Sequence, residues 1–147
     1  MRFGFAIGGL AVLVAGAAVA QTPVDISRSV YVEHIANGAR AIEPATTLRK
    51  GDKVVLVVEW RAEAPGRGFV ISSPIPRDLA FQRAGSDEVE VSTDGGRNWG
   101  RIGAMKIAEN GQSRLASVED VTDLRWRVPP AATAQGRGML TYSAIVR

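Results

Sequence analysis

The segment from Ser92 to Trp99, which reads Ser-Thr-Asp-Gly-Gly-Arg-Asn-Trp, is the sharpest chemical pattern in the sequence. Asp94 can accept hydrogen bonds from the amides of its own turn, and glycine adopts the positive φ angles that tight turns require. The pattern therefore predicts a well-specified hairpin whose structural turn residues are Ser92, Asp94, Gly95 and Gly96.

Trp99 is the aromatic residue of this segment that could bind a ligand, because Arg97 and Arg101 lie on either side of it. An exposed aromatic ring flanked by arginines can bind a sugar or a partner protein. These three residues are the candidate binding residues, although core placement of Trp99 is favoured for a small domain. We expect Trp60, at the end of an apolar run, and Trp126, between two arginines, to anchor the core.

Catalytic groups are scarce in this chain. His34 is the only histidine, so a metal site with two histidines or a histidine dyad is excluded, and a polar histidine on a strand is the expected role. A glycan hydrolase would need two acids flanking a cleft. The acids that could be considered for this role are Asp87, Glu88, Glu119, Asp120 and Asp123. A calcium site at Asp87, Asp94 or the loop over 119–123 is an open alternative, although the spacing of an EF-hand is absent. We assign no catalytic residue, no metal ligand and no cofactor.

Residues 1–20 have the organisation of a cleaved signal peptide. Arg2 provides the positive charge, an apolar run follows from Phe3 to Val14, and Ala18-Val19-Ala20 offers small residues for cleavage before Gln21. A retained membrane anchor is the alternative, but the run is rich in glycine and alanine and short for a spanning helix. The protein is therefore expected to be exported, to the periplasm or the medium, with no membrane span after cleavage.

Composition limits the partners of the remaining chain. It has no cysteine, so an exported domain must be stable through packing alone. Loss of Arg2 leaves 17 of the 18 basic residues against 15 acidic ones, a balance that argues against nucleic acid as a partner. The length of residues 21–147 suits a single domain.

The apolar residues after Gln21 recur with a period of two, which predicts an all-β fold. Lys53–Trp60 is the most apolar segment and is expected to form the central strand, whereas the Pro74-Ile75-Pro76 segment marks an edge or a crossing between sheets. Ser117 is expected to cap a helical turn over 118–122. The other strands are predicted at 29–35, 69–72, 79–82, 88–92, 99–107, 124–128 and 139–146, giving about eight strands of an antiparallel sandwich.

From Leu48 onward, the chain resembles the conserved repeat domain of unknown function (number eleven in its series) of large bacterial envelope proteins. The resemblance is carried by turn and packing motifs, namely Arg49-Lys50-Gly51-Asp52, Ser73-Pro74-Ile75-Pro76 with Leu79-Ala80-Phe81, Leu124-Arg125-Trp126, and the strand from Gly136 to Val146. It implies an immunoglobulin-like β-sandwich of about 7–9 strands and does not imply an activity.

The Ser92–Trp99 segment also resembles the Asp-box of sialidases and other propeller proteins, with serine, aspartate, glycine and tryptophan at matching positions. The box in those proteins is structural and recurs once per blade. A single box in 127 residues (147 less the 20 of the signal) is too little for a propeller, which needs at least about four blades.

These observations favour an exported, non-catalytic module with a structural or protein-interaction role in the bacterial envelope. A carbohydrate-binding module that uses the Asp-box-like hairpin is the first alternative, and a glycan hydrolase is the second. An interaction module should have an uncovered strand edge. Because Leu140–Val146 lacks proline and charge, the strand over Met139–Val146 is expected to be open to strand addition.

Overall fold

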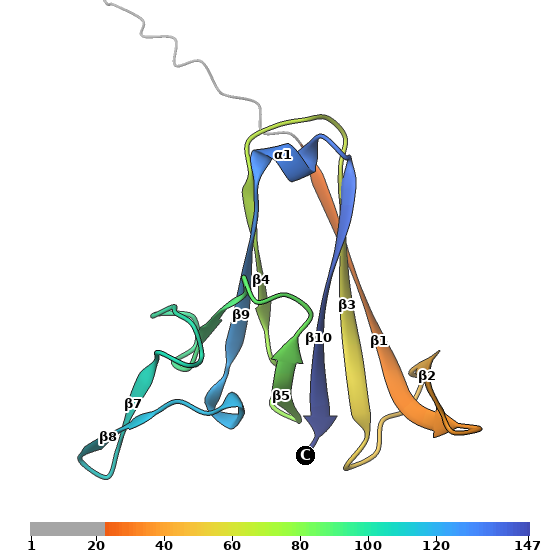
Figure 1. The fold of residues 1–147 in the computed structure, drawn as a ribbon. Coiled ribbons are helices and arrows are strands. Elements are labelled where there is room, and N and C mark those ends of the chain that lie inside the picture. Colours follow the sequence, from red (N-terminus) through yellow and green to blue (C-terminus); the bar gives the residue numbers. More distant parts are fainter. Residues whose placement is uncertain (1–22) are drawn as a thin grey trace, which may run out of the picture.

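The computed structural model describes residues 23–147 and shows an all-β sandwich (Figure 1). The signal peptide predicted at 1–20 lies outside these residues. The strands are β1 (Val24–Ala36), β2 (Ala39–Pro44), β3 (Lys53–Ala62), β4 (Phe69–Pro74), β5 (Leu79–Ala84), β6 (Glu90–Ser92), β7 (Lys106–Glu109), β8 (Gln112–Leu115), β9 (Asp123–Val128) and β10 (Arg137–Val146). Two short helices, η1 (Val118–Asp120) and α1 (Pro130–Thr133), complete the fold.

Two antiparallel sheets form the sandwich. The larger sheet has the strand order β2-β1-β3-β10-β5, and the smaller has the order β4-β9-β6. Together they contain eight strands, five and three, but not the predicted set: β2 was not predicted, and the strand predicted at 99–107 lies in neither sheet. A separate hairpin, β7–β8, projects from the side of the smaller sheet (Figure 1).

Strand β3 lies in the middle of the larger sheet, which confirms the prediction for Lys53–Trp60. Its alternate residues Val54, Val58 and Trp60 are at most 4% exposed and face the smaller sheet. Val55 and Val57 point to the opposite face, because successive side chains of a strand alternate between faces. The long apolar run therefore contributes side chains to both faces of the sheet, a buried inner face and a partly exposed outer face.

Aromatic rings fill the space between the two sheets. Trp60 of β3 meets Phe69 of β4 edge to face, with ring centroids 5.3 Å apart. Trp126 of β9 lies 6.2 Å from Tyr142 of β10. Both tryptophans are buried, at 4% and 3% exposure, which confirms their prediction as core anchors. Burial also raises the pKa of the Tyr142 hydroxyl.

The Pro74-Ile75-Pro76 segment connects β4 in the smaller sheet to β5 in the larger one, so it is a crossing between sheets, as predicted. The amide of Ile75 donates to the carbonyl of Thr122 at 2.8 Å, which holds the crossing against the segment before β9. Ser117 is the N-cap of η1, also as predicted.

Two expectations about strands are wrong. No return strand spans 99–107: Gly100 forms an isolated bridge with Val91, and the carbonyl of Arg101 then accepts bonds from the amides of Ala104 and Met105. This turn redirects the chain away from the smaller sheet. Extended pairing resumes only in β7, and its partner is β8.

The expectation that Met139–Val146 is open to strand addition is also overturned for Tyr142–Val146, which β5 covers. Strand β10 pairs with β3 from Arg137 to Ile145, and with β5 from Tyr142 to Val146. The crossing at Pro74–Pro76 brings β5 to this side of the sheet, where Leu79 and Phe81 are buried in the core. Burial of these two side chains is the physical reason why the predicted edge is covered.

Candidate functional site

The Ser92–Trp99 segment forms a closed network of hydrogen bonds around Asp94. One carboxylate oxygen accepts bonds from the hydroxyl of Ser92 at 2.8 Å, the amide of Asn98 at 2.9 Å and the amide of Arg97 at 3.1 Å. The other accepts one from the side-chain amide of Asn98 at 2.6 Å. These bonds, above all those from Asn98, hold the pKa of Asp94 well below its usual range. The carboxylate is therefore bonded on both oxygens within its own turn.

The rest of the turn is equally well satisfied. The buried hydroxyl of Ser92 accepts a bond from the amide of Gly96 at 2.9 Å. Gly95 and Gly96 adopt positive φ angles of 77° and 85°, as predicted for glycine in this turn. The amide of Gly95 also donates to the hydroxyl of Thr122 at 2.9 Å, which ties the turn to the segment before β9. The four structural turn residues therefore hold one another in place through hydrogen bonds within the turn.

Trp99 is half-buried, and its ring face is occupied by the protein itself. The guanidinium of Arg125 on β9 lies 4.5 Å from the centroid of the ring, a cation–π arrangement. The same guanidinium forms an ion pair with Glu90 at 2.9 Å. Trp99 is thus neither a core residue, as was favoured, nor an open stacking platform. Arg125 was missed in the sequence, where its alternation with Trp126 indicated only a solvent-facing strand residue.

The other two candidate binding residues do not converge with Trp99 on an open site. Arg101 donates to the backbone carbonyl of Asp87 at 2.6 Å, so it fastens the loop before β6. Arg97 is exposed, and its amide belongs to the network around Asp94. Among the large apolar side chains that are exposed within residues 23–147, none is aromatic.

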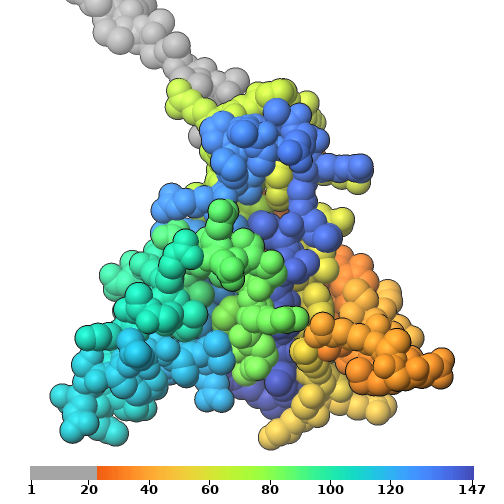
Figure 2. Space-filling model, in the orientation of Figure 1, coloured from red at the N-terminus to blue at the C-terminus, as the bar shows by residue number. Residues whose placement is uncertain are grey.

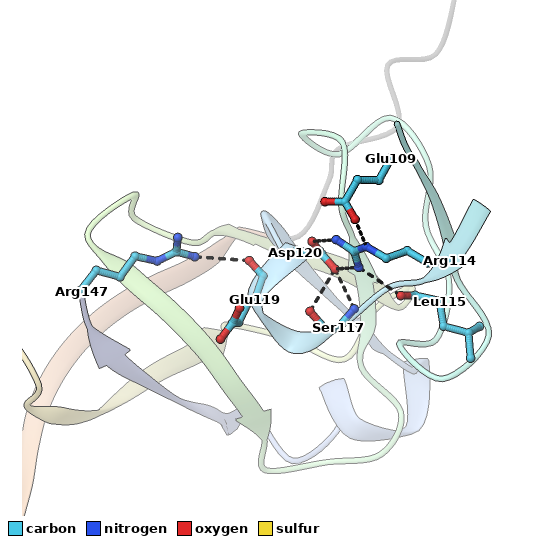
Figure 3. Close-up of polar contacts among 7 residues, drawn as sticks. All are labelled: Glu109, Arg114, Leu115, Ser117, Glu119, Asp120 and Arg147. Carbon is cyan, nitrogen blue, oxygen red and sulfur yellow. Dashed lines mark hydrogen bonds and ion pairs between the residues drawn. The ribbon is translucent and has the colours of Figure 1, made fainter. Parts of the chain in front are cut away.

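Asp120 belongs to a structural ion network (Figure 3). Its carboxylate accepts bonds from both terminal nitrogens of Arg114, at 2.8 and 3.0 Å, and from the amide of Ser117 at 2.7 Å. Arg114 also pairs with Glu109 at 2.7 Å, so one guanidinium joins β8 to two acids. The pairing lowers the pKa of Asp120 and raises that of Arg114. Glu119 contributes its backbone carbonyl, which accepts a bond from Arg147 at 3.3 Å.

The remaining ionisable candidates are dispersed over the surface. His34 lies on β1, 3.7 Å from Glu43 of β2. Asp123 accepts a bond from the neighbouring hydroxyl of Thr122 at 2.7 Å, and Asp87 and Glu88 are exposed in the loop before β6. Across residues 23–147, no three His, Asp or Glu side chains come together where they could hold a metal ion.

An uncovered strand edge does exist in this fold, on β1 instead of β10. Strand β2 pairs with β1 only from Tyr31 to Ala36. The carbonyl of Val30 accepts one bond from the amide of Ala45 at 2.9 Å, which shows that Val30 directs its backbone groups away from β3. Backbone groups alternate sides along an antiparallel strand. The backbone N–H and C=O groups of Val24, Ile26 and Arg28 therefore point to the same side as those of Val30, away from β3.

We call Val24–Val30 the β1 edge. Apart from the bond at Val30, its outward backbone groups have no strand partner in the part of the chain that the structure describes. Ile26 is 40% exposed beside Trp60, its partner across the β3 ladder. Arg28 reaches the opposite sheet, where it donates to the carbonyl of Ser72 on β4 at 3.4 Å. The β1 edge thus borders a side of the sandwich where the two sheets meet without a covering strand.

No family model matches the chain, and no curated protein or solved structure matches it either. Within residues 23–147, no helix has the length and apolar character needed to cross a membrane.

Proposed function

We propose that this protein is an exported interaction module of the bacterial envelope, and that it binds an extended segment of a partner protein along the β1 edge. The observation that supports this proposal is the run of backbone groups at Val24, Ile26 and Arg28 that have no strand partner within residues 23–147. Such an edge is a template for strand addition, in which main-chain hydrogen bonds supply affinity and alternate side chains supply specificity. Export rests on the organisation of residues 1–20.

The surroundings of the β1 edge indicate what the partner segment should look like. Ile26 lies beside Trp60, and the ring of Trp60 contacts Phe69 of β4. A strand added next to β1 would direct every second side chain toward this apolar margin. Its other side chains would lie beside Asp25 and Ser27, which face the opposite side of the sheet. An extended segment with alternating apolar and polar residues fits both surfaces.

Capture from an envelope extract with matched variants of the full chain tests this function. Ile26→Lys places a charge at the edge, which is a common natural protection against strand addition. Ile35→Lys is the control, because Ile35 is also an exposed isoleucine of β1, at 72% exposure, but lies where β2 covers the strand. We expect the wild type and Ile35→Lys to capture the same partner, and Ile26→Lys to lose it.

Hydrogen exchange on the purified complex then locates the contact. Strand addition should slow exchange of the amides of Val24, Ile26 and Arg28, because these amides gain hydrogen bonds. Exchange within the Ser92–Trp99 segment should stay the same. Capture that survives Ile26→Lys, or a complex with unchanged exchange at the β1 edge, would show that the partner binds elsewhere.

A further inference from the structure

The β1 edge has a defined length, because other parts of the chain limit it at one end. Strand β1 begins at Val24, and at the far end of the edge the carbonyl of Val30 accepts the bond from Ala45. Beyond this point β2 pairs with β1, and Figure 2 shows the β1–β2 hairpin in orange, projecting from one flank of the molecule. Within residues 23–147, the backbone groups open to an added strand are therefore those of Val24, Ile26 and Arg28.

The side chains of the β1 edge alternate in the way that the edge requires of its partner. Val24 packs against the core, and Ile26 lies on the same face of the strand. Asp25 and Ser27 are exposed on the opposite face. The segment Val24–Arg28 contains one acid and one base, so two copies of it carry no net charge that would drive them apart. The edge is therefore itself an extended segment with alternating apolar and polar residues.

We infer that the partner of the β1 edge is a second copy of this chain, which adds its own β1 edge in antiparallel orientation about a two-fold axis at Ile26. The inference rests on the proposed function and names the partner. A two-fold axis brings the same surface of both copies together, which is the commonest arrangement in protein dimers. The larger sheets of the two copies then become one continuous sheet.

An axis at Ile26 uses every open residue of both copies. Ile26 pairs with its counterpart, and Val24 pairs with Arg28 in both directions; each such pair exchanges two hydrogen bonds. The side chain of Ile26, which is 40% exposed in the single chain, then packs against the same side chain of the second copy. On the opposite face, Asp25 lies across from Ser27, whose hydroxyl can donate to the carboxylate. Both faces of the added strand therefore meet side chains of matching character.

The neighbouring symmetric registers are less favourable. An axis at Ser27 would need the carbonyl of Val30, which already accepts the bond from Ala45. An axis at Asp25 would place its two carboxylates directly opposite each other, which is destabilising. That axis would also leave Arg28 beyond the start of β1 in the second copy. The free backbone groups and the charges therefore favour the same register.

Sedimentation equilibrium of the purified protein tests the inference. The contact is short, so a weak dimer is expected, and protein concentrations from about 1 μM to about 1 mM cover its range. Ile26→Lys and Ile26→Asp should each be monomeric throughout, because like charges would face each other at the axis. An equimolar mixture of the two variants should recover the dimer, since lysine then faces aspartate. The matched control, Ile35→Lys, should dimerise like the wild type, because β2 covers this part of β1.

Hydrogen exchange of the wild type provides a measurement that needs no variant. Exchange of the amides of Val24, Ile26 and Arg28 should slow as the protein concentration rises through the dimerisation range, because these amides gain partners. Exchange within the Ser92–Trp99 segment should not depend on concentration. This contrast would locate the contact of the two copies at the β1 edge.

Three outcomes would overturn the inference. The first is a wild type that remains monomeric up to about 1 mM. The second is a dimer that persists in Ile26→Lys, or whose formation leaves exchange at the β1 edge unchanged. The third is a mixture of Ile26→Lys and Ile26→Asp that associates no more than either variant alone.

Failure of this inference can be told apart from failure of the proposed function. A monomeric wild type that still captures an envelope protein, and loses it on Ile26→Lys, would overturn the second copy as partner and leave the proposed function standing. Capture of an envelope protein through another face would count against the proposed function. The recovery of a dimer by mixing the two charged variants would still support pairing of two copies at Ile26.

Discussion

The Ser92–Trp99 hairpin and the outer face of the larger sheet differ in how fully their polar groups are hydrogen-bonded within the protein. In the hairpin, the carboxylate of Asp94 and the hydroxyl of Ser92 are bonded within the turn, and the ring of Trp99 is covered by Arg125. On the outer face, Ser143 lies across the ladder from Val55, and its hydroxyl is buried without a hydrogen-bond partner within residues 23–147. Arg83 forms no ion pair within the same residues. The segment with the strongest sequence pattern therefore satisfies its own polar groups, whereas polar groups without a partner lie where the sequence pattern is weak.

The largest effect on the free energy of unfolding is expected from a substitution in the core beneath the hairpin. Leu124 is fully buried and pairs with Val91 on β6 and Ser73 on β4. Leu124→Ala should lower the free energy of unfolding by about 2–5 kcal/mol, because it leaves a cavity between the sheets. Val57→Ala on the outer face should cost less than about 1 kcal/mol, since this side chain is already partly in water. Denaturant unfolding measures both, and equal costs would contradict the distinction between the two faces.

Ser92→Ala should have the next largest effect. The variant removes the acceptor for the amide of Gly96 and the donor to Asp94, in a position where Ser92 is 0% exposed. Leaving such groups unsatisfied should cost about 1–3 kcal/mol. The matched control is Ser113→Ala on the exposed hairpin β7–β8, which should change stability by less than about 0.5 kcal/mol. A cost for Ser92→Ala as small as that of its control would mean that the network does not stabilise the turn.

The contribution of Asp94 should depend on pH. Its folded-state pKa lies below the unfolded value of about 3.9, so its stabilisation is present above that value and is lost as the pH falls. Asp94→Asn should lower the melting temperature at neutral pH, and the gap to the wild type should narrow below about pH 4. Calorimetry from pH 7 to about pH 2 measures this gap. A gap that stays constant over this range would show that ionised Asp94 is not the cause.

Ser143→Ala should have the smallest effect on stability. Its hydroxyl is buried without a partner, so removing it should leave the free energy of unfolding within about 0.5 kcal/mol of the wild type or raise it slightly. This outcome would sharpen the comparison, because the same substitution at Ser92 is expected to be costly. A loss above about 1 kcal/mol would indicate that the hydroxyl of Ser143 has a structural partner.

Features that depend on a few neighbouring residues could be predicted from the sequence. The alternation around Trp126 indicated its buried face, the Pro74–Pro76 segment indicated the crossing, and Ser117 indicated the cap of η1. Each depends on local geometry: the period of a strand, the missing amide of proline, or a side chain next to its own turn.

Features that depend on long-range pairing could not be predicted in this way. Whether β10 is an edge depends on where β5 lies, and the sequence of β10 carries no signal for that. The register between them also shifts between Ser143 and Ala144, and this shift cannot be read from residue types. Arg125 likewise reaches Trp99 through the pairing of β9 with β6, which joins segments distant in the sequence.

The position of β10 between β3 and β5 has a consequence for the order of assembly. During synthesis, residues 79–84 emerge more than fifty positions before 137–146, the strand to which they bond. Chains dominated by distant contacts fold slowly, because loop closure must precede the gain from pairing. The larger sheet therefore cannot close until nearly all of the described chain has been made.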